Sequence, residues 1–200
     1  MSAFDANEDY WKQQFEFLQS EPGVWALDAD SLMRSFEILA QQAMRDAARL
    51  SVAPQPHLPE IGPNAMMLGA FATETLLKGI ALSSPSVQTA VQSHDKSIVK
   101  RLRSHNIRDI AQLACVSLNS LEEALCEQLE CFLLWAGRYS TPKKYKKMMP
   151  RPLAGGGWTL PNSFSTKDFS RIRGLTRSLR ALLRQQIERP ILGIKSEAEG

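Results

Sequence analysis

The chain has few of the residues from which disulfide frameworks and metal sites are built. Of its 200 residues, three are cysteine and three are histidine. Cys115, Cys126 and Cys131 form no Cys-x-x-Cys pair and no cluster with histidine at the spacing of a zinc site. We therefore expect no metal, no cofactor and no disulfide, and we interpret the thiols as core side chains in a reducing compartment.

Long apolar runs are also missing. No segment reaches the roughly 18 apolar residues of a membrane span, and the opening MSAFDANEDYW is acidic and lacks the apolar run of a signal peptide. The hydrophobic share of 44% still suffices for a core. We expect a soluble, cytoplasmic protein with no membrane contact. We also expect a single helical domain over residues 1–200, with a core bundle at about 30–190, an N-terminal extension at 1–25 and a flexible tail at 190–200.

No stretch alternates apolar and polar residues over the length of a strand, which argues against a β-sheet protein. Apolar residues recur instead every three or four positions, the period of an amphipathic helix. The segment 52–63 carries four prolines and reads as a semi-extended connector. The pattern predicts an all-α fold, an antiparallel helical bundle of about five or six helices with a proline-rich connector. The predicted helices are 4–20, 31–50, 64–82, 107–116, 120–137 and 165–188, and residues 83–104 are not placed.

Capping residues suggest where several of these helices begin and end. We expect a start near Asp30 or Ser31, and capping boxes at Ser120 with Glu123 and at Ser165 with Asp168. Pro190 is expected to end the last helix. The aromatic residues of the first helix are expected to pack onto the body of the protein.

The net charge of +3 conceals a strong division along the chain. Residues 1–137 hold 10 Lys/Arg and 17 Asp/Glu, a charge of −7, whereas residues 138–189 hold 13 and 2, a charge of +11. Two interpretations are open: the basic third binds an anionic partner such as RNA, or it is a solvated face balanced by the acidic part.

The basic residues fall into two groups. One is a lysine segment that surrounds an aromatic residue: Lys143, Lys144, Tyr145, Lys146 and Lys147. The other is a row on one face of the last helix, spaced by four, three and four residues: Arg173, Arg177, Arg180 and Arg184. We expect the side chains of the two groups to converge on a common surface that attracts polyanions.

Within the nearly all-apolar segment 64–82, Glu74 and Lys78 are the only charged residues. They stand four residues apart, on one face of the predicted helix. Two interpretations again remain: an ion pair at the rim of the core, or a charged pair that marks a cleft.

Three pieces of the chain together resemble HEPN-type helical domains (higher eukaryotes and prokaryotes nucleotide-binding). They are AMMLGAFATETLLKGIAL, then SHNIRDIAQLA, then the acidic and apolar helix that closes on WAGRYSTP, within residues 64–147. The resemblance implies an antiparallel bundle that commonly forms a homodimer. Many members of the family are metal-independent ribonucleases in toxin–antitoxin, phage-defence or RNA-processing systems.

Active members of that family carry an arginine followed by histidine after four to six residues. Arg138 matches the arginine, but Lys143, Lys144 and Tyr145 occupy the positions of the histidine, and none follows His105. Cleavage of RNA without a metal needs a general base, which His105, Glu74 or Tyr145 would have to supply. His105 is alternatively a structural residue at a helix start, and Glu74 resembles a polar position that faces the site in active members.

Three functions follow from these observations. The first is a nucleic-acid- or nucleotide-binding HEPN-like module, associated with RNA, that lacks the complete nuclease motif. The second is a metal-independent ribonuclease in which Arg138 acts with Glu74 or His105. The third is a protein–protein interaction module in which a protein partner meets the basic helix.

Overall fold

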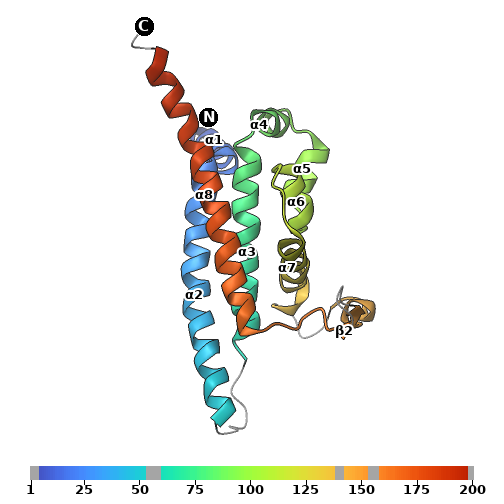
Figure 1. The fold of residues 1–200 in the computed structure, drawn as a ribbon. Helices are drawn as coiled ribbons and strands as arrows, with labels where there is room; N and C mark the ends of the chain where they lie inside the picture. The colour runs from blue at the N-terminus through green and yellow to red at the C-terminus, as the bar shows by residue number, and fades with distance from the viewer. Residues whose placement is uncertain (1–4, 53–59, 138–141, 153–157, 198–200) are drawn as a thin grey trace.

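The computed structural model describes residues 5–52, 60–137, 142–152 and 158–197 (Figure 1). Within them the fold is all-α, as the sequence pattern predicts, apart from one antiparallel pair of two-residue strands. The elements in chain order are α1 (Asp5–Ser20), α2 (Pro22–Val52), α3 (Gly62–Leu82), α4 (Pro85–Gln92), α5 (Lys96–Leu102), α6 (Ile107–Leu113), α7 (Ser120–Cys131), the π-helical turn η1 (Phe132–Ala136), the 3-10 turn η2 (Tyr145–Met148), β1 (Arg151–Pro152), β2 (Trp158–Thr159) and α8 (Thr166–Glu197).

Helix α3 is the centre of the molecule. It packs against α2 and α8 on one side and against α6, α7 and η1 on the other. Figure 1 shows that α2 runs in the opposite direction to α3, whereas α8 runs alongside α3 in the same direction. The core between these helices is built from side chains that solvent hardly reaches, among them Phe36, Met66, Leu76, Phe132 and Phe169.

Two glycines allow α3 to lie close to α8. A Cβ atom placed at Gly69 would lie 2.9 Å from Cγ2 of Ile172, and one at Gly79 would lie 2.9 Å from Cδ2 of Leu183. By length and composition α3 could cross a membrane, but 78% of its most apolar window is buried inside the molecule. Such burial is compatible with the core helix of a soluble protein.

Helix starts in the structure differ from several that the sequence predicts. Helix α2 begins at Pro22 rather than near Asp30, because proline suits the first turn of a helix. Asp30 instead forms an ion pair with Arg180 of α8. The capping box of α7 lies one residue earlier than predicted: Asn119 and Glu122 form it.

For helix α8 and the cysteines, the structure confirms some predictions and contradicts others. The side chain of Asp168 accepts a hydrogen bond from the backbone of Ser165, which confirms the predicted start of α8. Helix α8 nevertheless continues past Pro190, so the end predicted there is wrong; a proline within a helix removes one backbone hydrogen bond without necessarily ending it. Cys126 and Cys131 are buried, whereas Cys115 is exposed and is not a core thiol.

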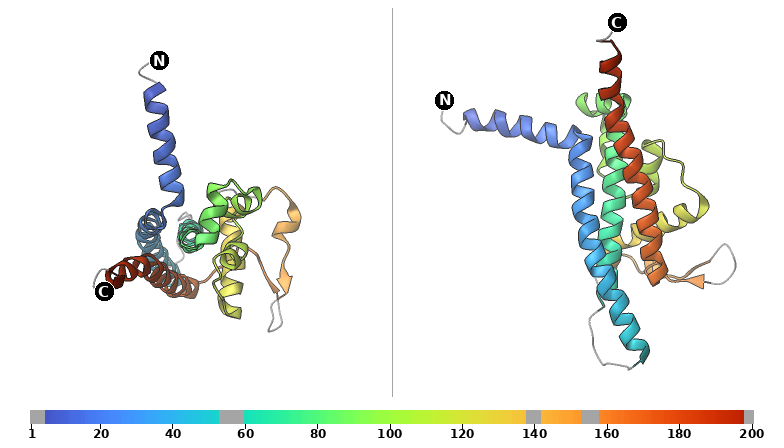
Figure 2. Two further views of the ribbon diagram at one scale, coloured as in Figure 1. Left: turned by 90° about the horizontal axis from the view of Figure 1, so that it is seen from above. Right: turned by 60° about the vertical axis from the view of Figure 1, so that its left-hand side comes forward.

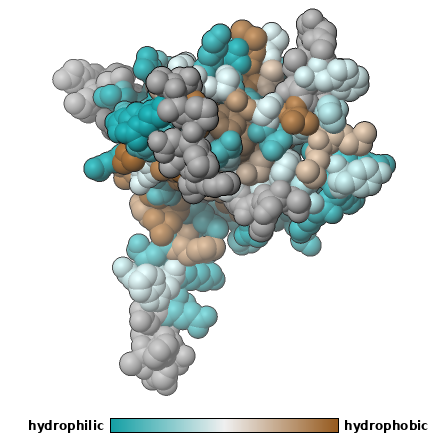
Figure 3. Space-filling view, turned by 90° about the horizontal axis from the view of Figure 1, so that it is seen from below, coloured by the Kyte–Doolittle hydropathy of each residue, from teal (hydrophilic) through white to brown (hydrophobic). Residues whose placement is uncertain are grey.

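The expectation that α1 packs onto the body is also wrong. Helix α1 projects sideways from the top of α2 in both views of Figure 2, and Figure 3 shows it as an arm that stands away from the rest. Its aromatic side chains Tyr10, Trp11, Phe15 and Phe17 are each more than half exposed.

Candidate functional site: a buried carboxylate between lysine and histidine

Four residues of α3 form a stripe at helical spacing that faces the second half of the chain: Met67, Phe71, Glu74 and Lys78. Glu74 and Lys78 are buried: they expose only 4% and 8% of their surface to solvent. Oε1 of Glu74 lies 2.5 Å from Nζ of Lys78. The charged pair expected from the sequence therefore exists, and it lies inside the fold.

His105 completes this cluster from a different part of the chain. Its Nδ1 lies 2.9 Å from Oε2 of Glu74, so the carboxylate bridges lysine and histidine with one oxygen each. Phe71 holds the imidazole edge-on, with the ring centroids 6.1 Å apart and the planes at 83°. The cap of α6 is the next residue, Asn106, whose side chain accepts a hydrogen bond from the backbone of Asp109.

This arrangement orients the imidazole for acid–base chemistry. When Nδ1–H donates a hydrogen bond to Glu74, the other ring nitrogen, Nε2, carries a lone pair that can accept a proton. The His105 side chain is 38% exposed, whereas that of Glu74 is only 6% exposed, so solvent or a ligand reaches the histidine and not the carboxylate. Lys78 balances the buried negative charge, which would otherwise be costly.

Arg138, the residue that matches the arginine of the nuclease motif, lies outside the described residues. Its neighbour Gly137 is described, and it packs against the stripe: a Cβ atom at Gly137 would lie 2.5 Å from Cβ of Met67. Glu74 is seven residues further along α3, which corresponds to about 10 Å along the helix axis. The chain thus leaves η1 two helical turns from the Glu74–His105 pair.

The predicted lysine segment lies at the surface. Lys143, Lys144, Lys146 and Lys147 are all exposed, and Tyr145 exposes 73% of its surface. None of these lysines forms an ion pair with any residue that the structure describes. The charges of this segment are open to an external partner.

The predicted arginine row has a different environment. Arg173 forms a bidentate pair with Glu37 of α2, and Arg180 forms one with Asp30 of the same helix. Hydrogen bonds to these carboxylates raise the pKa of both arginines above its ordinary value. Arg184 pairs with Glu188 on its own helix, and only Arg177 of the row makes no ion pair with a described residue.

The two basic groups do not converge. The paired arginines line the groove between α2 and α8. The turn η2 lies beyond α7, on the other side of α3, in both Figure 1 and the left view of Figure 2. A single flat nucleic-acid surface made by both groups is therefore excluded for this arrangement of the chain.

The sequence pairs Glu74 with Lys78 and singles out His105, but it does not join Glu74 to His105. The two are 31 residues apart, and their contact depends on how α6 packs on α3. The sequence indicates part of this site through the spacing of Phe71, Glu74 and Lys78, which places an aromatic residue and a carboxylate on one face of the helix. It shows which face is polar but not which residue meets it.

The chain was compared with protein-family models, with curated proteins and with solved structures, and none matches it. The structure shows a helical fold with a Lys–Glu–His cluster around a buried carboxylate and with an exposed lysine segment.

Proposed function

We propose that the protein is a HEPN-like, cytoplasmic RNA-binding module that holds RNA through the lysine segment 143–147. In this proposal the helical bundle is HEPN-like, although α3 and α8 run in the same direction, and the protein acts in a phage-defence or toxin–antitoxin system. The observation that carries the RNA-binding proposal is the exposure of four lysines around Tyr145 with no carboxylate of the described chain paired to them.

The chemistry of the segment suits a single strand. Lysine ammonium groups contact phosphates without reading sequence, and each contact releases a counterion, so affinity falls as salt rises. An exposed tyrosine among them offers a face on which an unpaired base can stack. The paired arginines of α8 contribute less, because a phosphate would have to displace Glu37 or Asp30.

Fluorescence anisotropy with a labelled single-stranded RNA, over a series of salt concentrations, tests this proposal. The double variant Lys143→Gln/Lys144→Gln should bind more weakly, and the slope of log K against log salt should fall by about 1.4, since each contact contributes about 0.7. The matched control Arg177→Gln/Arg184→Gln removes the same charge from exposed positions of α8 and should change the slope little. Equal effects of the two variants, or binding that does not depend on salt, would reject the proposal.

The Glu74–His105 pair favours a second candidate function, a metal-independent ribonuclease. The 2′-hydroxyl attacks the phosphate and loses its proton to a base, while the bond from phosphorus to the 5′-oxygen breaks and that oxygen takes a proton from water. A histidine held by a carboxylate is suited to be the base. Arg138, from the segment after Gly137, would stabilise the negative charge on the phosphorane. In this candidate His105 is the base, Glu74 is its positioning residue and Arg138 is the electrostatic partner.

Incubation of labelled RNA with the protein in EDTA distinguishes the two candidates. A ribonuclease should lose most of its cleavage in His105→Gln and in Arg138→Ala, whereas Lys143→Gln should chiefly weaken binding. A binding module should show no cleavage beyond that of the His105→Gln variant. Circular dichroism of each variant confirms that the helices are retained.

A further inference from the structure

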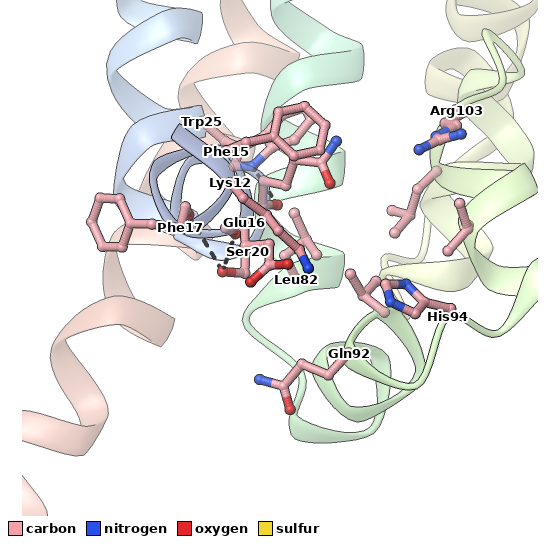
Figure 4. Close-up of a pocket in the computed structure, with 14 residues that line it drawn as sticks. Lys12, Phe15, Glu16, Phe17, Ser20, Trp25, Leu82, Gln92, His94 and Arg103 are labelled. Atoms are coloured by element: carbon pink, nitrogen blue, oxygen red, sulfur yellow. Dashed lines mark hydrogen bonds between the residues drawn. The ribbon is translucent and has the colours of Figure 1, made fainter. Parts of the chain in front are cut away.

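The two walls of the groove beside α1 differ in polarity. A groove of about 610 Å³ lies between α1 and the α4–α5 region (Figure 4). Its far wall is largely apolar, formed by Leu82, Val91, Val99 and Leu102, with Trp25 at its base. The near wall is mainly the polar side of α1, which presents Lys12, Glu16, Gln19 and Ser20, with Phe15 and Phe17 at its edges.

Most of the apolar side of α1 consequently faces solvent, although Phe15 and Phe17 also border the groove. Trp11, Phe15 and Leu18 follow each other at intervals of four and three residues, and they are 62%, 56% and 49% exposed. Tyr10 and Phe17 extend the patch, and each is 52% exposed. Five large apolar side chains exposed on one short helix exceed what an isolated surface normally carries.

The connection to α2 fixes α1 in this orientation. A single residue, Glu21, separates the two helices, and its carboxylate accepts a hydrogen bond from the backbone N–H of Gly23. Nε1 of Trp25 donates to the carbonyl of Gln19. These bonds hold the polar side of α1 toward its own groove, so α1 does not cover the apolar wall of the same chain.

Charge complementarity indicates what does cover it. Residues 5–20 carry Asp5, Glu8, Asp9 and Glu16 against Lys12, a net charge of −3. Residues 94–103, of which His94, Val99, Leu102 and Arg103 line the opposite wall, carry four Lys/Arg against Asp95, a net charge of +3. Arg101 is held by Asp109, whereas Lys96, Lys100 and Arg103 are exposed.

We infer that the groove receives α1 of a second copy of this chain, so that two molecules exchange their N-terminal helices about a twofold axis. The apolar side of each α1 covers the apolar wall of the other molecule, and its carboxylates meet Lys96, Lys100 and Arg103 there. A twofold interface requires both complementary surfaces on one chain, and this chain carries both. The inference does not depend on RNA binding.

The available area is sufficient. A large aromatic side chain buries 150–250 Å² in full, so each half-exposed side chain of the patch still offers about 100 Å². Five side chains from each of two copies give about 1,000 Å² before the groove walls are counted, and a stable interface needs about 1,200–2,000 Å² in total.

An acidic helix is also poorly suited to a membrane surface, because amphipathic helices that bind anionic lipid are rich in lysine and arginine.

The test combines two complementary variants of the full-length protein. Trp11→Glu/Leu18→Glu disables the helix, and Lys100→Glu/Arg103→Glu disables the groove; all four positions are exposed, so the fold should persist. Light scattering coupled to size-exclusion chromatography should give twice the chain mass for the unmodified protein and weaken the dimer at least about tenfold for each variant alone. A mixture of the two variants should restore a dimer of one copy of each, because one intact helix then meets one intact groove.

The control Leu121→Glu alters a leucine of α7 that is 71% exposed and lies outside the groove, and it should leave the dimer unchanged. A single-chain mass at all concentrations would overturn the inference, whether α1 closes on its own groove or stays free. A dimer that survives Trp11→Glu/Leu18→Glu would overturn it too, because its interface must then lie elsewhere. Failure of the mixed variants to associate, with each folded, would also overturn it.

Discussion

Substitutions of Tyr145 distinguish base stacking from attraction by charge alone. It is 73% exposed on η2, between lysines on both sides. If a base of the RNA stacks on its ring, Tyr145→Ala should weaken binding by about 1–3 kcal/mol, whereas Tyr145→Phe keeps the ring and should bind almost normally. Anisotropy titrations at one salt concentration measure both. Identical losses in the two variants would assign the contribution to the hydroxyl group rather than to stacking.

Cys126 and Cys115 differ in environment and should differ in reactivity. Burial, with a smaller contribution from Glu130 and Glu122, raises the pKa of Cys126 to about 12 from an ordinary 9.0. Because only the thiolate reacts, Cys126 should be modified about a thousandfold more slowly than an ordinary thiol near pH 8 until the protein unfolds. Exposed Cys115 should react at once. A thiol titration with and without denaturant tests this, and rapid reaction of Cys126 in the folded protein would contradict it.

The same shift has a defined effect on stability. Between pH 9 and pH 12 the unfolded chain loses the Cys126 proton while the folded chain keeps it. The unfolded state then binds fewer protons, so the free energy of unfolding falls as pH rises through this range. Replacement of Cys126 by alanine removes this contribution and should flatten the alkaline part of the stability curve.

At the scale of the element, Gly69 determines how closely α3 approaches its neighbours. An added methyl group there would lie 2.9 Å from Ile172 and 3.2 Å from Phe36, both of which are fully buried. Gly69→Ala should therefore destabilise the protein by about 1–3 kcal/mol, even though alanine favours helix more than glycine does. Urea denaturation measures the change. Gly174→Ala is the control, because its added methyl group meets nothing within 4 Å and should stabilise α8 slightly.

The existence of most elements could be predicted from the sequence, because apolar spacing is a local property. The starts of α2 and α7 were less predictable, because several residues near each start are suitable caps. At α7, Asn119 precedes Ser120 and has an equally good partner in Glu122. The position of α1 could not be predicted at all, since an amphipathic pattern shows that a helix has an apolar side and not what covers that side.

The contacts of the candidate site could also be predicted only in part from the sequence. Glu74 and Lys78 are four residues apart on one helix, and their pairing followed from spacing alone. The contact of Glu74 with His105 needed the packing of α6 on α3, which a single sequence does not specify. The exposed lysines were predictable because no apolar pattern runs through them, whereas the environment of the arginine row was not.

At the scale of the whole molecule, the division of charge along the chain serves the fold as well as any ligand. Carboxylates of the acidic part, at Asp30 and Glu37 of α2, meet arginines of the basic part, at Arg180 and Arg173 of α8. Segments more than a hundred residues apart are thereby joined at the surface of the bundle. Of the two basic groups, the lysine segment is the one whose lysines form no ion pair with a described residue, whereas three of the four arginines in the row are paired.

The Arg173–Glu37 pair tests this division directly. The guanidinium also lies 5.7 Å from the ring centroid of Phe36, so Arg173 belongs to the α2–α8 interface by packing as well as by charge. Both side chains are partly exposed, and after solvent screening a double-mutant cycle with Arg173→Gln and Glu37→Gln should give a coupling of about 0.5–1 kcal/mol that decreases with salt. Urea denaturation of the four proteins measures this coupling, and the same preparations should bind RNA with nearly unchanged affinity. If Arg173→Gln instead reduced RNA affinity as much as Lys143→Gln while leaving stability unchanged, the arginine would belong to the ligand surface, and the separation of structural and ligand-binding charges would be wrong.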